Sequence, residues 1–271
     1  MKANLFSHPL FILFITVILQ KYATAAPSRY SEFFNERTLI DIDVSGSPPN
    51  RIKVTPSMDF PGGLHYTIQS NSRHTHCIGT VTDLGCVVLE GDKKITSRNI
   101  LIVPKEDDAM YVRVISIKKN KKGGSIARVR EFFRKKENLA YIEIFREYIE
   151  LNAMEQECSQ YINARILFEY WDHSMTPEDL YILPVKYSVK PEFDLKVTIG
   201  MVRFGEYIVD DRVDGLLNRE VIWEGGLDHP RIRVLSQYAN GMEFDRVYTF
   251  SSELNKFVSR STKRKSLTLR E

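Results

Sequence analysis

Short segments of alternating polarity, separated by turns, restrict the fold of this chain more than any other feature. Tyr111–Ile117 alternates like a half-buried strand, and the polar turn Lys118–Gly124 leads into a second run, Ile126–Phe133. This pair predicts a β-hairpin with a basic tip. About a dozen such segments occur without strand–helix alternation. We therefore predict an all-β fold, with helices only around Leu151–Gln160 and Ser252–Arg260, and we find no internal repeat.

The first residues have the pattern of a secretory signal peptide. Lys2 precedes the apolar run Pro9–Leu19, and the small residues Ala23–Ala25 form a cleavage site. The apolar run has 11 residues and Lys21 follows it closely, whereas a membrane-spanning helix needs about 20 apolar residues. We predict that residues 1–26 are a signal peptide and that the protein is secreted and extracellular. No later segment is long and apolar enough to predict a transmembrane helix.

The net charge excludes one broad class of function. The whole chain has 38 basic and 35 acidic residues, and removing the signal peptide, with Lys2 and Lys21, leaves 36 against 35. So small an excess gives no general attraction to nucleic acid, and we expect no nucleic-acid partner.

Three cysteines remain after the signal peptide: Cys77, Cys86 and Cys158. They are too few for a disulfide scaffold, so a hydrophobic core has to stabilise the protein. A hairpin that turns at Asp83–Leu84 would leave Cys77 about 13 Å from Cys86 along the strands, too far for a disulfide. We interpret Cys86 as a small buried apolar residue.

Several segments, in order, resemble one enzyme family. They are Cys77–Val88, Glu137–Ile144, Tyr170–Asp172, Leu183–Val185 and Val247–Val258. The first is similar to the Cys-Gly-Gly-Thr-Leu-Ile…Ala-Ala-His-Cys segment of chymotrypsin-like (trypsin-fold) serine proteases, and the last to the terminal helix of that family. The resemblance implies two six-stranded antiparallel β-barrels with a C-terminal helix. It divides the mature chain into a leader (27–50), a trypsin-like domain (51–258) and a basic tail (259–271).

The resemblance does not extend to the catalytic residues of the family. It places Asp92 at the base histidine, Asn138 at the orienting aspartate, and Leu217 or Asn218 at the nucleophilic serine. None of these side chains performs the proton transfer or attack that the mechanism needs. The resemblance also places Asp211 where an acid lies at the base of the specificity pocket; the alternative is a solvated loop acid.

A basic stretch between Lys118 and Lys136 is the second candidate site. Its cations are Lys118, Lys119, Lys121, Lys122, Arg128, Arg130, Arg134, Lys135 and Lys136, and its single acid is Glu131. Such a stretch could bind a heparin-like polysaccharide, an anionic lipid or an acidic protein face, or it could be a solvated hairpin that protects an edge strand from aggregation. We interpret His74 and His76 as a surface pair, and we predict neither a metal site nor a cofactor.

Three functions are compatible with these observations. The first is a secreted serine protease homologue without catalytic residues, which binds an extracellular protein, such as a protease or its substrate, as a regulator, decoy or adaptor. The second is an active serine endopeptidase whose triad lies elsewhere in the sequence. The third is a secreted module that binds a polyanion through the basic stretch.

Overall fold

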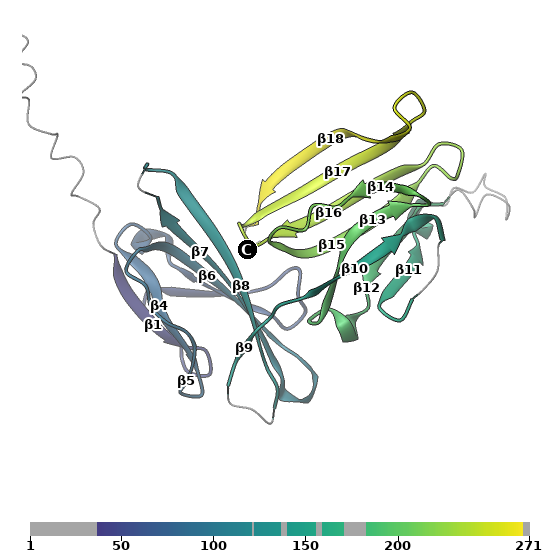
Figure 1. Ribbon diagram of the computed structural model, residues 1–271. Helices are drawn as coiled ribbons and strands as arrows, with labels where there is room; N and C mark the ends of the chain where they lie inside the picture. Colours follow the sequence, from purple (N-terminus) through teal and green to yellow (C-terminus); the bar gives the residue numbers. More distant parts are fainter. Residues whose placement is uncertain (1–36, 121, 137–139, 156–158, 171–182, 268–271) are drawn as a thin grey trace, which may run out of the picture. The chain divides into compact units, whose positions relative to one another are not determined.

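The computed structural model describes residues 37–120, 122–136, 140–155, 159–170 and 183–267 (Figure 1). The regular elements of these residues are β-strands and short 3-10 turns, and the described part contains no α-helix. The 3-10 turns are Ser70–Ser72, Glu106–Asp108, Ala153–Glu155, Phe168–Tyr170 and Pro191–Phe193. No helix in the described part is long and apolar enough to cross a membrane. The all-β prediction is confirmed.

The first nine strands form a three-stranded and a six-stranded sheet, which we call the first repeat. Their bounds are β1 Thr38–Asp43, β2 Ile52–Pro56, β3 Leu64–Ile68, β4 His76–Asp83, β5 Cys86–Leu89, β6 Ile95–Pro104, β7 Met110–Lys119, β8 Ser125–Arg134 and β9 Ile142–Glu143. The smaller sheet has the order β1-β4-β5, with β1 and β4 parallel, and the larger has the order β2-β3-β6-β7-β8-β9.

The next nine strands form a second pair of sheets, the second repeat. Their bounds are β10 Glu147–Asn152, β11 Ile162–Ile166, β12 Val185–Val189, β13 Val197–Phe204, β14 Tyr207–Asp210, β15 Leu216–Glu224, β16 Arg231–Tyr238, β17 Met242–Ser251 and β18 Lys256–Ser266. The smaller sheet has the order β10-β13-β14, with β10 and β13 parallel, and the larger has the order β11-β12-β15-β16-β17-β18. Each strand pair of the first repeat has its counterpart here.

The described chain is therefore a structural repeat, although no repeat is visible in the sequence. The segment from β3 to β6 aligns without a gap with the segment from β12 to β15. Six of the aligned positions carry the same residue in both segments. The pairs are Tyr66/Tyr187, Ile78/Ile199, Gly79/Gly200, Val81/Val202, Val88/Val209 and Arg98/Arg219. Their contacts are also repeated: the hydroxyl of Tyr66 donates to the carbonyl oxygen of Val44, and that of Tyr187 to Ala153. Six scattered identities are too few to be seen without the strand pairing.

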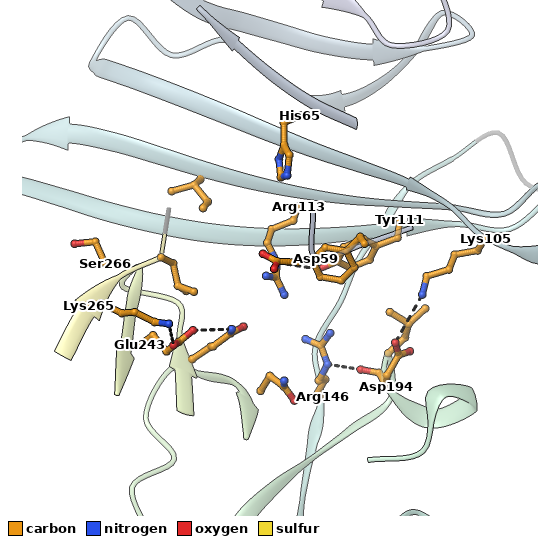
Figure 2. Close-up of a pocket in the computed structure, with 16 residues that line it drawn as sticks. Asp59, His65, Lys105, Tyr111, Arg113, Arg146, Asp194, Glu243, Lys265 and Ser266 are labelled. Atoms are coloured by element: carbon orange, nitrogen blue, oxygen red, sulfur yellow. Dashed lines mark hydrogen bonds and ion pairs between the residues drawn. The ribbon is translucent and has the colours of Figure 1, made fainter. Parts of the chain in front are cut away.

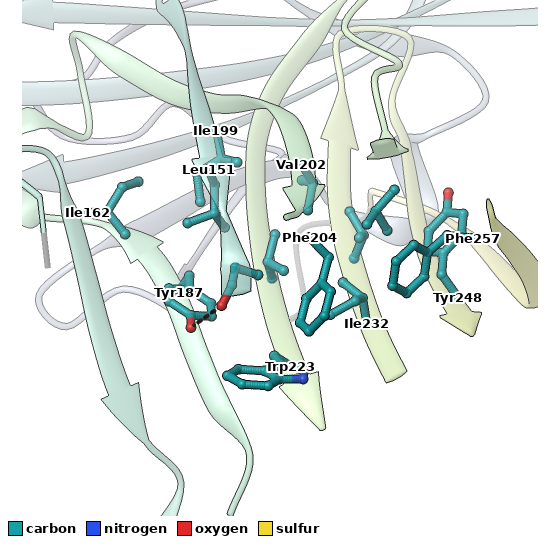
Figure 3. Packing of buried hydrophobic residues seen from close by; sticks show 14 residues of the cluster. Leu151, Ile162, Tyr187, Ile199, Val202, Phe204, Trp223, Ile232, Tyr248 and Phe257 are labelled. Atoms are coloured by element: carbon teal, nitrogen blue, oxygen red, sulfur yellow. Dashed lines mark hydrogen bonds between the residues drawn. The ribbon is translucent and has the colours of Figure 1, made fainter. Parts of the chain in front are cut away.

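A hydrophobic core lies between the two sheets of each repeat. In the second repeat, Phe204 of the small sheet packs its ring against Trp223 and Phe257 of the large sheet, at centroid distances of 5.4 and 5.8 Å (Figure 3). In the first repeat, Ile78 and Val81 of β4 belong to one buried cluster with residues of the large sheet. Each strand has one apolar face, because its side chains alternate between the two sides of the sheet. In each repeat the apolar faces of the two sheets meet, and together they form one core.

The predicted C-terminal helix is wrong, because its residues form a β-hairpin. β17 and β18 pair in antiparallel register around a turn at residues 252–255, in which Asn255 has a φ of 48°. Phe250 lies opposite Phe257 in this ladder, with ring centroids 5.5 Å apart. Burying Phe257 in the core of the second repeat favours a strand over an isolated helix of mostly polar residues. The helix predicted around Leu151–Gln160 is also wrong where it is described, since β10 ends there at Asn152.

The closed six-stranded barrels implied by the resemblance are not formed either. In each repeat the six-stranded sheet is open: its end strands, β2 and β9 or β11 and β18, do not pair with one another in the described part. The parallel pairs β1–β4 and β10–β13 also depart from an all-antiparallel arrangement. The two repeats are open pairs of sheets that pack face to face over their cores.

The predicted boundaries fall as follows on this architecture. The signal peptide (1–26) lies outside the described residues, and β1 lies in the segment interpreted as a leader (27–50), where it buries Ile42. β18 continues into the segment interpreted as a basic tail (259–271).

The two described cysteines are expected to differ in reactivity. Cys77 and Cys86 are both free thiols; Cys77 is fully buried and Cys86 is half-buried, opposite Asp83 beside the Leu84–Gly85 turn. Burial also raises the pKa of Cys77. We expect iodoacetamide at pH 8 to alkylate Cys86 faster than Cys77 in the folded protein and both alike after denaturation, as measured by peptide mass spectrometry. Equal rates in the folded protein would contradict this packing.

Candidate functional site

The structure describes two of the three positions predicted for the lost triad. Asp92 lies in the turn before β6, where its carboxylate accepts a hydrogen bond from the backbone of Lys94 at 2.9 Å. Leu217 is the bulged residue of β15, next to Asn218. Asn138 lies outside the described residues. Asp92 lies in the first repeat and Leu217 in the second. The structure does not test the loss of a protease triad, which stays a prediction from the resemblance.

The acid predicted for a specificity pocket, Asp211, is an exposed residue of the loop after β14. Its neighbour Asp210, which the sequence analysis passed over, has a fully buried side chain. The Asp210 carboxylate accepts a hydrogen bond from the Tyr248 hydroxyl at 2.7 Å and pairs with the guanidinium of Arg212 at 3.0 Å. Arg219 lies at 3.6 Å. Burial raises the pKa of Asp210, but the Arg212 hydrogen bond and the charge of Arg219 outweigh it and lower the pKa.

The cations of the predicted basic stretch divide into several kinds. Arg134 is buried against Asp83, at 3.1 Å, and Lys136 pairs with Asp108 on the surface, at 3.0 Å. Lys121 lies outside the described residues. The exposed cations of the stretch are Lys118, Lys119, Lys122, Arg128, Lys135 and Lys136. Arg130 is partly buried.

Part of this stretch lies on the inner face of the large sheet of the first repeat. Lys118, Arg128 and Arg130 point to the face on which Phe132 enters the core, since side chains two residues apart share a face. Arg98 on β6 lies opposite Ser116 on the same face. The four cations line a cavity of about 380 Å³, which we call the basic cavity; its acids are Glu90 and Asp92.

Arg98 is the buried member of this group, with 3% of its surface exposed. Its Nε donates to the Ser116 hydroxyl at 3.3 Å, and its Nη1 donates to the carbonyl oxygens of Gly79 and Glu90. Within the described residues, Nη2 has no hydrogen-bond partner and no carboxylate lies within ion-pair distance of the guanidinium. Burial lowers the pKa of Arg98, and it outweighs the nearby charge of Asp92, which raises that pKa.

Arg130 has one terminal nitrogen free in the same way. Its Nε and Nη2 bind both carboxylate oxygens of Glu143, at 2.9 and 2.6 Å, and its guanidinium lies over the Phe132 ring. Nη1 has no partner among the residues that the structure describes. The basic cavity therefore holds two guanidinium nitrogens that could donate to a ligand.

A second cavity, of about 400 Å³, is lined by charged residues of both signs (Figure 2). We call it the polar cavity. Lys105 pairs with Asp194 at 3.9 Å, and Lys265 pairs with Glu243 at 2.5 Å. Its charges are largely neutralised by one another, unlike those of the basic cavity.

One carboxylate behind the polar cavity collects three donors. Glu131, with 2% of its surface exposed, accepts hydrogen bonds from the Tyr111 hydroxyl and from Arg146, and lies 2.7 Å from Nη2 of Arg113. Burial raises the pKa of Glu131, but the charges of Arg113 and Arg146 and the Tyr111 hydrogen bond outweigh it and lower the pKa to about 2. Both carboxylate oxygens of Glu131 therefore already accept hydrogen bonds or pair with an arginine.

The remaining sequence candidate was a histidine pair. The ring of His76 contacts the guanidinium of Arg51 and the hydroxyl of Thr75, whereas His74 is exposed. Within the described residues, no three His, Cys, Asp or Glu side chains are grouped as a metal ion would need.

Arg98 was not predicted as a site residue, and it is the one of the four cavity cations that lies outside the basic stretch. Its neighbours in the sequence, Ser97 and Asn99, are polar and gave no signal of burial; only its equivalence to Arg219 of β15 marks the position. A charged residue inside an otherwise buried strand needs partners there, and so marks a polar site.

Comparison with protein-family models, curated proteins and solved structures gives no match for this chain.

Proposed function

We propose that this is an exported, non-catalytic protein that binds an extracellular polysaccharide with acidic groups through the basic cavity and the exposed cations around it. The observation that carries the proposal is the convergence of Arg98, Lys118, Arg128 and Arg130 on one cavity of about 380 Å³. That volume is in the range of small-ligand sites. Two guanidinium nitrogens there have no partner in the described part of the protein.

Electrostatics favours this site over the polar cavity. A buried cation without a counter-ion is costly, and binding an anion removes that cost. The polar cavity offers no comparable gain, because its lysines already pair with Asp194 and Glu243.

A binding role is also what the resemblance to serine proteases suggests. That resemblance, however, implies closed barrels and a terminal helix, and the described strands form neither. The proposal therefore rests on the basic cavity and not on the resemblance. Binding of an extracellular protease or of its substrate remains a separate prediction from the sequence.

The test is retention on immobilised heparin. We expect the wild-type protein to be retained and the K118E/R128E double variant to elute at a clearly lower salt concentration, because both side chains are exposed at the mouth of the cavity.

A control with the same change in net charge is K190E/K256E. Neither lysine forms an ion pair in the described part, and both lie outside the first repeat. If both double variants lose retention equally, the attraction is a general effect of charge and the proposed site is wrong. No retention of the wild-type protein would contradict the proposed function itself.

A further inference from the structure

The second repeat contains, at the position equivalent to the basic cavity, an anion supplied by the protein itself. β5 and β14 pair with equivalent strands in the same register, so that Leu89 lies opposite Val81 as Asp210 lies opposite Val202. Leu89 of the first repeat is therefore the counterpart of Asp210.

The cations around this position are also equivalent. Arg98 and Arg219 each donate Nε to a serine hydroxyl, of Ser116 or Ser236, and each donates Nη1 to a glycine carbonyl oxygen. The strand pairing makes Arg130 the counterpart of Arg246, since the two lie opposite Val114 and Val234.

In the second repeat the carboxylate of Asp210 lies between these two arginines. Nη2 of Arg219 is 3.6 Å from one of its oxygens, and Nη1 of Arg246 is 3.8 Å from the other. In the first repeat, Nη2 of Arg98 and Nη1 of Arg130 are the nitrogens without a partner in the described part. These two nitrogens are thus the counterparts of the two guanidinium nitrogens, of Arg219 and Arg246, that lie near the carboxylate of Asp210.

Smaller or cationic side chains replace the groups that fill the rest of the space. Gly91 stands where the second repeat has Arg212, and Lys118 stands where it has Tyr238. Arg128 likewise replaces Phe244, which lies opposite Ser236 as Arg128 lies opposite Ser116. The first repeat therefore has the two arginines without the carboxylate, and it has two further cations around a cavity.

We propose that the basic cavity binds a carboxylate group of the ligand where the second repeat has the carboxylate of Asp210, held by Nη2 of Arg98 and Nη1 of Arg130. This assignment rests on the proposed function and specifies its ligand as a carboxylate-bearing one, such as a polysaccharide that contains uronic acid. A planar two-oxygen group fits between two guanidinium groups, as Asp210 does. Lys118 and Arg128 would contact neighbouring acidic groups of the same ligand.

The first test introduces the missing carboxylate into the protein. In L89D the new side chain would occupy the position of the ligand group, whereas L89N has nearly the same shape without the charge. We measure the midpoint of thermal unfolding in sodium acetate, sulfate and phosphate, each against sodium chloride at equal ionic strength. The difference between wild type and L89D cancels the general effect of each salt on stability.

We expect acetate to raise the midpoint of wild type and L89N and to lose this effect in L89D. An equal response of wild type and L89D would overturn the assignment, and so would a larger difference with sulfate or phosphate than with acetate. Heparin retention separates this failure from that of the proposed function, because L89D leaves the exposed cations in place. Wild-type retention without an acetate effect would contradict the inference alone.

A second measurement does not depend on the folding of L89D. Acetate is titrated into wild-type protein with ¹⁵N-labelled arginine, and the side-chain signals are followed by NMR. We expect two signals to shift with a common midpoint, one of them absent in R130K, while the signal of the saturated Arg219 stays in place. A stationary Arg130 signal would overturn the assignment.

Discussion

Replacing Glu131 with Gln is expected to lower the free energy of unfolding by about 3–5 kcal/mol, because it leaves buried arginines without their counter-ion. Glu131 has 1% of its side chain exposed and pairs with Arg113 and Arg146, whose side chains are 13% and 9% exposed. The Tyr111 hydroxyl also donates to this carboxylate. Equilibrium unfolding in urea, followed by circular dichroism, measures the change.

The matched control is E220Q, which removes a carboxylate from another six-stranded sheet. Glu220 pairs with Lys186 at 2.9 Å, but the two side chains are 34% and 29% exposed. Partly exposed pairs of this kind contribute about 0–1 kcal/mol. Equal losses in E131Q and E220Q would show that the Glu131 group is not a special stabilising element.

The same carboxylate predicts how stability depends on pH. In the folded protein its pKa is about 2, against 4.5 in the unfolded chain, so its contribution is fully present above pH 4.5. As the pH falls from 4.5 to about 2 the unfolded chain binds the proton first, and about 3 kcal/mol of stability is lost. Urea midpoints between pH 5 and 2.5 should therefore fall more steeply in wild type than in E131Q; parallel curves would contradict this pKa.

Replacing Asp210 with Asn is expected to have a similarly large effect, about 3–5 kcal/mol. The Asp210 carboxylate is fully buried and balances the buried guanidinium of Arg219 together with Arg246 and Arg212. An amide supplies no negative charge, so the fully buried Arg219 would keep its charge without a counter-ion.

The neighbouring residue provides the control. D211N changes an exposed carboxylate that is one residue away, and its effect should stay within about 0.5 kcal/mol. Urea unfolding of the two variants under one condition measures both. A larger loss in D211N than in D210N would mean that the side chains of this loop are assigned the wrong way round.

Local patterns in the sequence were sufficient for much of the fold. Tyr111–Ile117 and Ile126–Phe133 were predicted as a hairpin and lie within β7 and β8. This is because side chains of a strand alternate between its faces, a property of neighbouring residues only. The basic hairpin was visible for the same reason. We predicted a helix in Val247–Val258 because these residues resemble the terminal helix of serine proteases. In this protein the segment instead belongs to an antiparallel hairpin.

Patterns within short stretches of sequence were enough to predict the strand-rich class, the hairpin of β7 and β8 and the cluster of cations in that hairpin. Three features depend on the folded arrangement: the structural repeat, the parallel pairing of β1 with β4, and the burial of Asp210 beside an exposed Asp211. The fold also brought Arg98 to the cations of the hairpin. Two strands that are distant in sequence pair only when the fold brings them together, and a charge loses its water only when other elements pack over it. A local sequence pattern contains neither kind of information.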